Sequence, residues 1–394
     1  MEERLVIGLT GSFGSGCTTL AKILSKHSFD YISLTSILNK VALSRGKDPS
    51  VLPKKDRRKL LQDIGNELRL KDQGFLIKEA LKLVKDDGKD IVISCIKNPG
   101  EIKELKKIPN AYIIALDTSF EERQKRILIP EYEGDLNQFI KDNDREGDER
   151  IKHGQRLQEC VDLADVLINN EEFNHAPKNW DDFEDRIKKD FIQLLKSPGY
   201  REPTDLELWM HVAYSISLQS KCLKRQVGAI ILKGGHVVAA GKNDVAQDEE
   251  PCRDYYKECY RDKLRNQIKH CALCGQKLDE DLRCKNRNCQ YNEINLMKLL
   301  DKCRSLHAEE NAILQASKLG GIGLQGGRLF TTTFPCSLCA NKIVNVGIEE
   351  VVYVESYPDR DSYNFLQRHP KIILTKFEGV KAAGFYHLFK DKNY

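Results

Sequence analysis

Short apolar runs recur through the first part of the chain, and polar, helix-like stretches separate them. The runs lie at Leu5–Leu9, Asp90–Ser94, Ala111–Asp117 and Ala164–Asn170. Their nearly continuous apolar character is typical of strands that are buried on both faces of a parallel sheet. The alternation of such strands with helices predicts an α/β domain over residues 1–170.

The second part of the chain has a different pattern. An amphipathic helix is predicted at Asp205–Ser217, and the apolar runs Val227–Leu232 and His236–Gly241 follow it. The turn residues Lys233-Gly234-Gly235 join these two runs, which indicates a β-hairpin. A further strand-like run lies at Arg328–Thr333. We expect a second, α/β/α domain here.

The two patterns meet in a polar, helix-like stretch at residues 171–203. It ends in the turn cluster Ser197-Pro198-Gly199-Tyr200, which favours a domain boundary. We therefore expect a helical linker at 171–203 and a second domain at 204–394, with a cysteine-rich insertion at about 250–300.

Composition narrows the class of protein. A net charge of +4 over 394 residues is small and argues against a dedicated nucleic-acid binder. No apolar run approaches the roughly 18 residues of a membrane span, and no secretory leader is evident. Ten of the 13 cysteines lie between Cys222 and Cys339. We expect a cytoplasmic protein, without membrane contact, whose cysteines bind metal rather than form disulfides.

The strongest chemical signal is His307-Ala308-Glu309, followed downstream by Pro335-Cys336-Ser337-Leu338-Cys339. One imidazole and two thiolates can hold zinc tetrahedrally and leave a fourth position for water, which zinc activates. Glu309 would then carry protons to the ring nitrogen and the leaving ammonia. This is the signature of zinc-dependent nucleobase deaminases. The alternatives are a core histidine and a structural or redox cysteine pair.

The insertion contains a second cysteine pattern. Cys271, Cys274, Cys284 and Cys289 form a Cys-x2-Cys-x9-Cys-x4-Cys set, which indicates a closed, four-thiolate structural zinc site. Three spare cysteines could replace any of these four: Cys252, Cys259 and Cys303. From Cys252 to Arg304 there are 13 Lys and Arg against 8 Asp and Glu, an excess of 5. This excess suits an anionic substrate or an RNA surface, and it also suits a solvated basic insertion.

A glycine-rich loop follows the first apolar run and precedes a helix that begins near Thr18. The pattern G-x-x-x-x-G-K-[ST] is met except at its lysine, where Cys17 stands. We expect this loop to bind a nucleoside triphosphate or another phosphate ligand as a regulatory signal, without efficient phosphoryl transfer. Its binding residues would be Gly11, Gly14, Ser15, Gly16, Cys17, Thr18 and Thr19. A structural turn is the alternative. Residues 1–170 resemble the P-loop nucleoside-monophosphate kinases.

The second domain resembles the deoxycytidylate deaminase family. The resemblance rests on the zinc motif, on Cys222–Ala229 and on Gly241-Lys242-Asn243-Asp244. It implies a cytidine-deaminase-like fold, a homo-oligomer and a deoxycytidine-nucleotide substrate. It also implies substrate contacts from Asn243, Arg225, Thr333 and Tyr357. Asn243 would contact the deoxyribose 3′ hydroxyl, the backbone near Thr333 would read the cytosine amino group, and Tyr357 would lie over the pyrimidine. A turn role for Asn243 and a packing role for Tyr357 remain open.

The order of the two domains resembles that of bacterial anti-phage deoxycytidine-nucleotide deaminases. Such proteins deplete dCTP and dCMP, and some are held inactive by a partner RNA. The resemblance implies antiviral defence, with regulation by RNA or nucleotide. Three alternatives remain: a housekeeping dCMP deaminase, a polynucleotide cytosine deaminase and a nucleotide sensor without catalysis.

Overall fold

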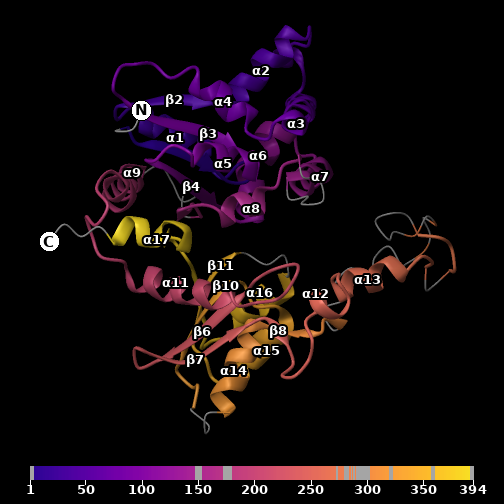
Figure 1. Cartoon of the computed structure of the whole chain (residues 1–394). Coiled ribbons are helices and arrows are strands. Elements are labelled where there is room, and N and C mark those ends of the chain that lie inside the picture. Colours follow the sequence, from indigo (N-terminus) through magenta and orange to yellow (C-terminus); the bar gives the residue numbers. More distant parts are fainter. Residues whose placement is uncertain are drawn as a thin grey trace. The chain divides into compact units, whose positions relative to one another are not determined.

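The chain forms two compact units (Figure 1). The computed structural model describes residues 4–146, 153–171, 180–271, 274–278, 284, 286, 289, 302–318, 323–355 and 360–390. The first unit comprises Met1–Leu208 together with Phe377–Tyr394, and the second comprises Trp209–Lys376. No described helix combines the length and the apolar character that a membrane crossing needs.

A six-stranded sheet forms the centre of the first unit, in the order β13-β5-β4-β1-β3-β2. All neighbouring strands are parallel except β13, which is antiparallel to β5. Their bounds are β1 Val6–Thr10, β2 Phe29–Ser33, β3 Asp90–Ile96, β4 Ala111–Asp117, β5 Val166–Asn169 and β13 Gly379–Val380. The predicted parallel sheet is therefore confirmed, and β1, from which the glycine loop departs, lies between β3 and β4.

Helices surround this sheet. They are α1 Cys17–Ser25, α2 Leu34–Ser44, α3 Lys54–Lys71, α4 Phe75–Leu81, α5 Pro99–Leu105, α6 Phe120–Tyr132, α7 Leu136–Glu146, α8 Leu157–Asp162, α9 Trp180–Arg186, α10 Gln193–Lys196 and α17 Ala382–Phe389. Two shorter pieces are a 3₁₀ turn at Pro49–Val51 and a π-helical stretch at Ile187–Ile192. One apolar cluster joins α1, the strands, the helices after residue 180 and α17.

The units differ from the expected domains at both boundaries. Residues that we assigned to a linker, including Phe183, Ile187 and Phe191, are buried in the core of the first unit. The C-terminal residues, assigned to the second domain, also return to the first unit, where Val380 on β13 pairs with β5. Long-range pairing of this kind has no local sequence signal.

A buried carboxylate links the two places where the chain passes between the units. Glu207, on α11 (Asp205–Ser217), accepts hydrogen bonds from both terminal nitrogens of Arg201 at 2.7 and 2.8 Å. It also accepts from the N–H groups of Thr204 and Val380 at 2.7 and 2.8 Å. Burial alone would raise the pKa of Glu207, but these four bonds hold it below the usual value.

The second unit is built on a five-stranded sheet of order β12-β11-β10-β6-β7. The strands are β6 Gly228–Lys233, β7 His236–Lys242, β10 Arg328–Thr333, β11 Glu350–Glu355 and β12 Ile373–Lys376; β8 Asp244–Val245 pairs separately with β9 Ser305–Leu306. The helices beyond α11 are α12 Cys252–Tyr255, α13 Tyr260–Gln267, α14 Ala308–Lys318, α15 Ser337–Asn345 and α16 Arg360–Arg368. This mixed α/β arrangement agrees with the expected fold class.

Two glycines allow helices to lie directly on this sheet. A Cβ at Gly228 would lie 2.0 Å from the carbonyl oxygen of Ala213 on α11, and one at Gly241 would lie 2.2 Å from that of Ala308 on α14. Real Cβ atoms do not approach backbone so closely, so only glycine fits at these two positions. Gly241 thereby fixes the position of α14 against β7.

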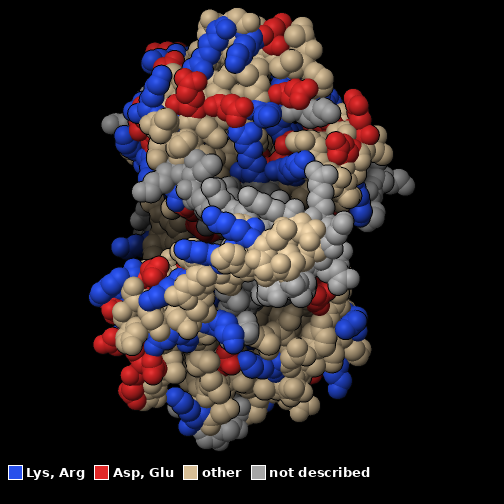
Figure 2. Space-filling model, turned by 90° about the vertical axis from the view of Figure 1, so that its right-hand side faces the viewer, with Lys and Arg blue, Asp and Glu red and all other residues tan. Residues whose placement is uncertain are grey.

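On the face drawn in Figure 2, lysine and arginine are interspersed with aspartate and glutamate. This distribution agrees with the small net charge of +4.

Candidate active site and metal centres

Three predicted ligands of the second unit meet at the ends of two helices. His307 lies between β9 and the first residue of α14, Cys336 immediately precedes α15, and Cys339 lies within it. The Nδ1 atom of His307 is 3.2 Å from the Sγ of Cys336 and 3.4 Å from that of Cys339. The three donor atoms lie within 4.8 Å of one another. One nitrogen and two sulfurs fit a zinc ion that keeps a fourth position open.

The electrostatics of this cluster favour ligand chemistry. Hydrogen bonding from Cys339 and then from His307 lowers the pKa of the Cys336 thiol, although burial opposes this, whereas the bond from Cys336 and burial raise the pKa of Cys339. Cys336 and Cys339 are 5% and 1% exposed, so the pair is shielded from solvent. A thiolate is the form that binds metal.

Glu309 lies in the first turn of α14, two residues beyond His307. The residue is 4% exposed, and burial raises the pKa of its carboxyl from 4.5 to about 7, with His307 acting in the opposite direction. A carboxyl with a pKa near neutrality can both take up and release a proton at physiological pH. Its neighbour Glu310 is bound to Lys342 of α15 at 2.5 Å, which ties the two site helices together.

The predicted substrate residues are placed differently from one another. Thr333 ends β10 and is 8% exposed, whereas Arg225 lies on the exposed stretch before β6. The side chain of Asn243 accepts a hydrogen bond from the Val227 N–H at 2.8 Å and donates to the Arg225 carbonyl at 2.8 Å. Asn243 therefore holds the loop before β6 in place, and its contact with substrate stays a prediction. Tyr357 lies outside the described residues.

The proline of the motif lies before its helix and not within it. Helix α15 begins at Ser337, so Pro335 precedes the N-cap Cys336. The carbonyl oxygen of Pro335 instead accepts a hydrogen bond from the buried Ser362 hydroxyl of α16 at 2.5 Å. This contact fixes the chain immediately before the two cysteines.

The glycine loop of the first unit joins β1 to α1. Gly14 and Gly16 have φ values of +80° and +105°, and a Cβ at Gly16 would lie 2.5 Å from the amide nitrogen of Asn170. Gly11 also has a positive φ. Ser15 is fully buried, Cys17 begins α1 as a buried thiol, and Thr18 and Thr19 are exposed. Burial raises the pKa of Cys17 to about 11, so it is a neutral thiol at pH 7.

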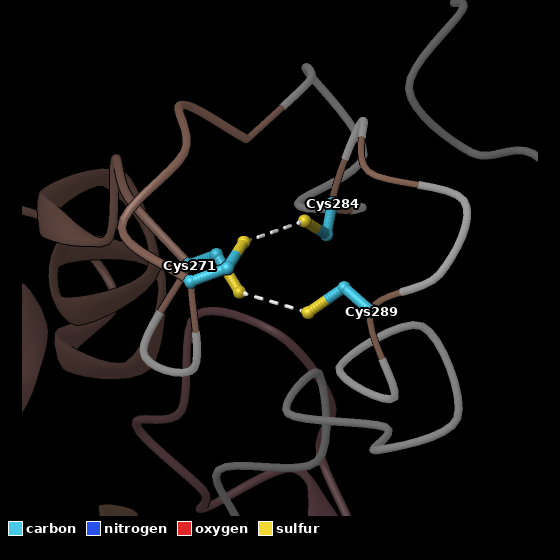
Figure 3. Close-up of side chains that lie close together, drawn as sticks. Cys271, Cys284 and Cys289 are labelled. Atoms are coloured by element: carbon cyan, nitrogen blue, oxygen red, sulfur yellow. Dashed lines mark hydrogen bonds between the residues drawn. The ribbon is translucent and has the colours of Figure 1, made fainter.

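The four cysteines of the insertion converge, as Figure 3 shows for Cys271, Cys284 and Cys289. The Sγ atoms of Cys271 and Cys289 are 3.6 Å apart, and those of Cys274 and Cys284 are 3.3 Å apart. All four sulfurs lie within 4.8 Å of one another. A bond from the Gly275 N–H to the Cys271 carbonyl, 2.9 Å long, closes the turn between the first two cysteines. Four thiols without an open position fit a structural zinc.

The spare cysteines do not belong to that cluster. Cys252, Cys259 and Cys303 line a separate cavity of about 20 Å³, and Cys222 joins them there. A space of this size holds roughly one water or ion. Sequence reasoning missed this group because its residues are spread over some 80 positions of the chain. They come together only where β8 pairs with β9. The only available signal was the concentration of cysteines itself.

Comparison with known proteins places this site in a family. Residues 203–355 match the family model described as the cytidine and deoxycytidylate deaminase zinc-binding region. The deoxycytidylate deaminase of Enterobacteria phage T4 is 31% identical over 156 residues, which cover 38% of this chain and 76% of that protein. The deoxycytidylate deaminase of Schizosaccharomyces pombe is 30% identical over 197 residues. These residues cover 50% of this chain and about half (48%) of the yeast protein.

Among solved structures, the dCMP deaminase of cyanophage S-TIM5 in complex with dCMP and dUMP is 23% identical, covering 45% of this chain and 100% of that one with a TM-score of 0.30. Residues 203–355, which match the family model, contain His307, Glu309, Cys336 and Cys339. The chain therefore belongs to the cytidine and deoxycytidylate deaminase family.

Proposed function

We propose that this protein hydrolytically deaminates deoxycytidine nucleotides, dCMP, dCTP or both. The observation that carries this proposal is the cluster of His307, Cys336 and Cys339, in which the two sulfurs lie 3.2 and 3.4 Å from one imidazole nitrogen. The buried Glu309 lies two residues beyond His307. The phage and yeast relatives are deoxycytidylate deaminases by name, which supports a deoxycytidine nucleotide as the substrate.

Each residue of the site would have its own role in the reaction. His307, Cys336 and Cys339 would hold the zinc, which when bound supplies an activated water. Glu309 would take one proton from that water and pass it to the ring nitrogen, and would then carry the second proton of the water to the departing ammonia. Burial raises the pKa of Glu309 in the metal-free site, which favours the uptake of a proton by this carboxylate. Thr333, Asn243, Arg225 and Tyr357 remain proposed substrate contacts.

The test is a substrate panel. The purified full chain, loaded with zinc, is incubated with dCMP, dCTP, CMP, CTP and a cytosine-containing single-stranded oligonucleotide, and ammonia release is measured beside a Glu309→Gln variant. We expect release from deoxycytidine nucleotides by the parent chain only. Release from the oligonucleotide alone would support the polynucleotide deaminase, and release from no substrate would support the sensor. Turnover of dCMP without dCTP would favour the housekeeping enzyme.

We also propose that Cys271, Cys274, Cys284 and Cys289 bind a second, structural zinc. The four sulfurs within 4.8 Å support this. Around these four cysteines the described packing is small: the Gly275 turn, the bridge between Leu278 and Cys284 and an apolar cluster that includes Cys271. A metal would supply much of the local folding free energy there.

A third proposal concerns the loop at Gly11–Thr19, which we infer binds a nucleoside triphosphate as a regulatory signal. Its positive-φ glycines and buried Ser15 suit a backbone anion site.

Depletion of deoxycytidine nucleotides in antiviral defence is proposed from the domain order alone. Measurement of dCTP and dCMP in infected bacteria that express either the parent chain or the Glu309→Gln variant tests it, and equal pools would refute it.

A further inference from the structure

The first unit contains a cavity of about 710 Å³ beside the glycine loop. Small-molecule sites in proteins commonly measure about 300–1,000 Å³. Its charged lining is mainly basic: six residues carry positive charge, against the acidic Glu131 and Glu146, an excess of four. The basic residues are Lys54, Arg57, Arg58, Arg69, Lys97 and Arg126. An anionic ligand of nucleotide size matches both the volume and the charge.

Lys97, the residue that follows β3, brings an ammonium group to the loop. Its Nζ lies 2.5 Å from the carbonyl oxygen of Gly11. Two backbone bonds fix Lys97 itself: its N–H donates to Glu101 at 2.8 Å, and its carbonyl accepts from the N–H of Arg156 at 3.0 Å. Lys97, 80 positions along the chain from Cys17, therefore places beside the loop the positive charge that the loop lacks at Cys17.

The end of β3 has an irregular backbone that accounts for this placement. Cys95 has a φ of +71°, a left-handed conformation that is uncommon for a residue other than glycine. The pairing of β1 with β3 also shifts register there, from Gly8 opposite Ile93 to Thr10 opposite Ile96. Such bulges re-aim the side chains that follow them. Strained backbone of this kind persists where the surrounding structure requires it, and it is frequent at functional sites.

An internal carboxylate already occupies the anion-binding groups of the loop. Glu146, the last residue of α7, accepts a hydrogen bond from the Phe13 N–H at 3.0 Å, and its other oxygen lies 3.0 Å from Lys97 Nζ. The Glu146 side chain is 4% exposed. A loop N–H and an ammonium around one carboxylate are the partners that a phosphate oxygen would use.

The cavity wall also holds hydrogen-bond acceptors without a partner. Within the described part of the chain, the Oε1 of Gln62 and the Oδ1 of Asn170 are buried and unsatisfied, and both residues line the cavity and are 5% exposed. Gln62 comes from α3, and apolar residues of α2 to α4, such as Leu38 and Leu76, line the cavity with it. A buried acceptor without a donor is costly. Sugar hydroxyls or base amino groups could satisfy it, whereas a phosphate could not.

We propose that this cavity binds a nucleoside phosphate whose phosphate group lies on the glycine loop and Lys97 and displaces the Glu146 carboxylate, and with it the end of α7. This inference rests on the proposed nucleotide binding at the loop and adds the cation, the internal competitor and the place of the nucleoside. Glu146 sets the affinity, because a ligand must break two bonds to the carboxylate before it can form its own.

The test uses calorimetric titration of the full chain with AMP, GMP, ATP, GTP and pyrophosphate, none of which carries cytosine. Lys97→Met should weaken nucleotide binding on the order of tenfold or more, because a charge-assisted contact is lost. Glu146→Gln should strengthen it by a similar factor. Lys78→Met removes another lysine–carboxylate pair, with Asp72 at 2.8 Å, away from the cavity and should leave the affinity unchanged.

Because Lys97→Met leaves Glu146 buried without its cation, the double variant Lys97→Met/Glu146→Gln is the second test. It should melt close to the parent chain and bind nucleotide at least tenfold more weakly than Glu146→Gln alone. Hydrogen exchange of residues 136–146 should accelerate when nucleotide binds to the parent chain.

The outcomes distinguish the displacement of Glu146 from nucleotide binding at the loop itself. Nucleotide binding that neither Lys97→Met nor Glu146→Gln alters, or that leaves exchange in α7 unchanged, would overturn this inference and leave loop binding intact. Pyrophosphate binding as tightly as every nucleotide would overturn the place of the nucleoside. Binding of no ligand in the panel would refute the loop proposal as well.

Discussion

Replacement of Glu309 by Gln should remove activity and at the same time stabilise the metal-free protein. The carboxyl is 4% exposed, and burial raises its pKa from 4.5 to about 7. Below pH 4.5 the group is protonated in both the folded and the unfolded chain and contributes no difference. Between pH 4.5 and 7 the unfolded chain releases this proton while the folded chain retains it, so stability falls as the pH rises.

The size of this effect follows from the two pKa values. Their difference is about 2.5, and each pKa unit corresponds to roughly 1.4 kcal/mol, so the full cost above pH 7 is about 3 kcal/mol. Glutamine has nearly the same shape and no charge to desolvate. Zinc beside the site would favour the ionised carboxylate, so the gain should shrink when the metal is bound.

The assay compares urea unfolding of the parent chain and the Glu309→Gln variant at pH 5 and pH 8, with and without a chelator. We expect a gain of up to about 3 kcal/mol for the metal-free variant at pH 8 and of less than about 1 kcal/mol at pH 5. Glu349→Gln, the same change at an exposed position of this unit, should alter neither stability nor activity. Retained deaminase activity in the variant, or an equal gain at both pH values, would refute the reasoning.

Three further changes test other parts of the structure. Replacing Cys284 and Cys289 by Ser should remove one zinc per chain relative to the parent and lower the melting temperature; an unchanged metal content, measured by atomic emission, would exclude the structural site. Gly241→Ala should reduce activity strongly, because its Cβ would press on α14, whereas Gly323→Ala, whose nearest contact is 3.7 Å away, should be silent in the deaminase assay. Glu207→Gln should lower the free energy of unfolding by about 3–5 kcal/mol at neutral pH, since it breaks a buried ion pair. Because the pKa of Glu207 is lower in the folded than in the unfolded chain, the parent should lose this advantage as the pH falls below 4.5. A constant difference in stability across an acid titration would contradict the account.

Local sequence signals were sufficient where the structure depends on neighbours in the chain. Strand β4 at Ala111–Asp117 and helix α11 at Asp205–Ser217 have the predicted bounds, because a continuous apolar run and an amphipathic period each identify the element. The zinc motif was visible for the same reason. Its ligands occur in two short segments, each with its own spacing.

The features that were missed depend on contacts between distant residues. Strand β2 at Phe29–Ser33 is only partly buried, so it has no continuous apolar run. Nothing in the sequence near Lys97 indicates that a bulge directs it to Gly11. The group of Cys222 and the three spare cysteines forms only after β8 and β9 pair. Pairing over such separations is not encoded in any short pattern.

The path of the chain sets a limit on how the deaminase unit can be separated. Both ends of that unit are joined to the first unit, because β13 and α17 (yellow in Figure 1) return to the first sheet. Four apolar residues of this C-terminal segment are no more than 8% exposed: Val380, Phe385, Leu388 and Phe389. Burial of such side chains contributes about 1.5–3 kcal/mol each, or roughly 6–12 kcal/mol together, as an upper estimate.

That sum is comparable with the whole stability of a typical domain, about 5–15 kcal/mol. A chain that ends at Lys376 should therefore unfold in its first unit, although every residue of the glycine loop and of the 710 Å³ cavity is still present. Limited proteolysis and circular dichroism of this truncated chain are the measurement. Retention of a protease-resistant first unit would mean that the C-terminal segment only covers the sheet. A first unit that unfolds would show that the second unit is an insertion within the fold of the first unit rather than a domain appended to it.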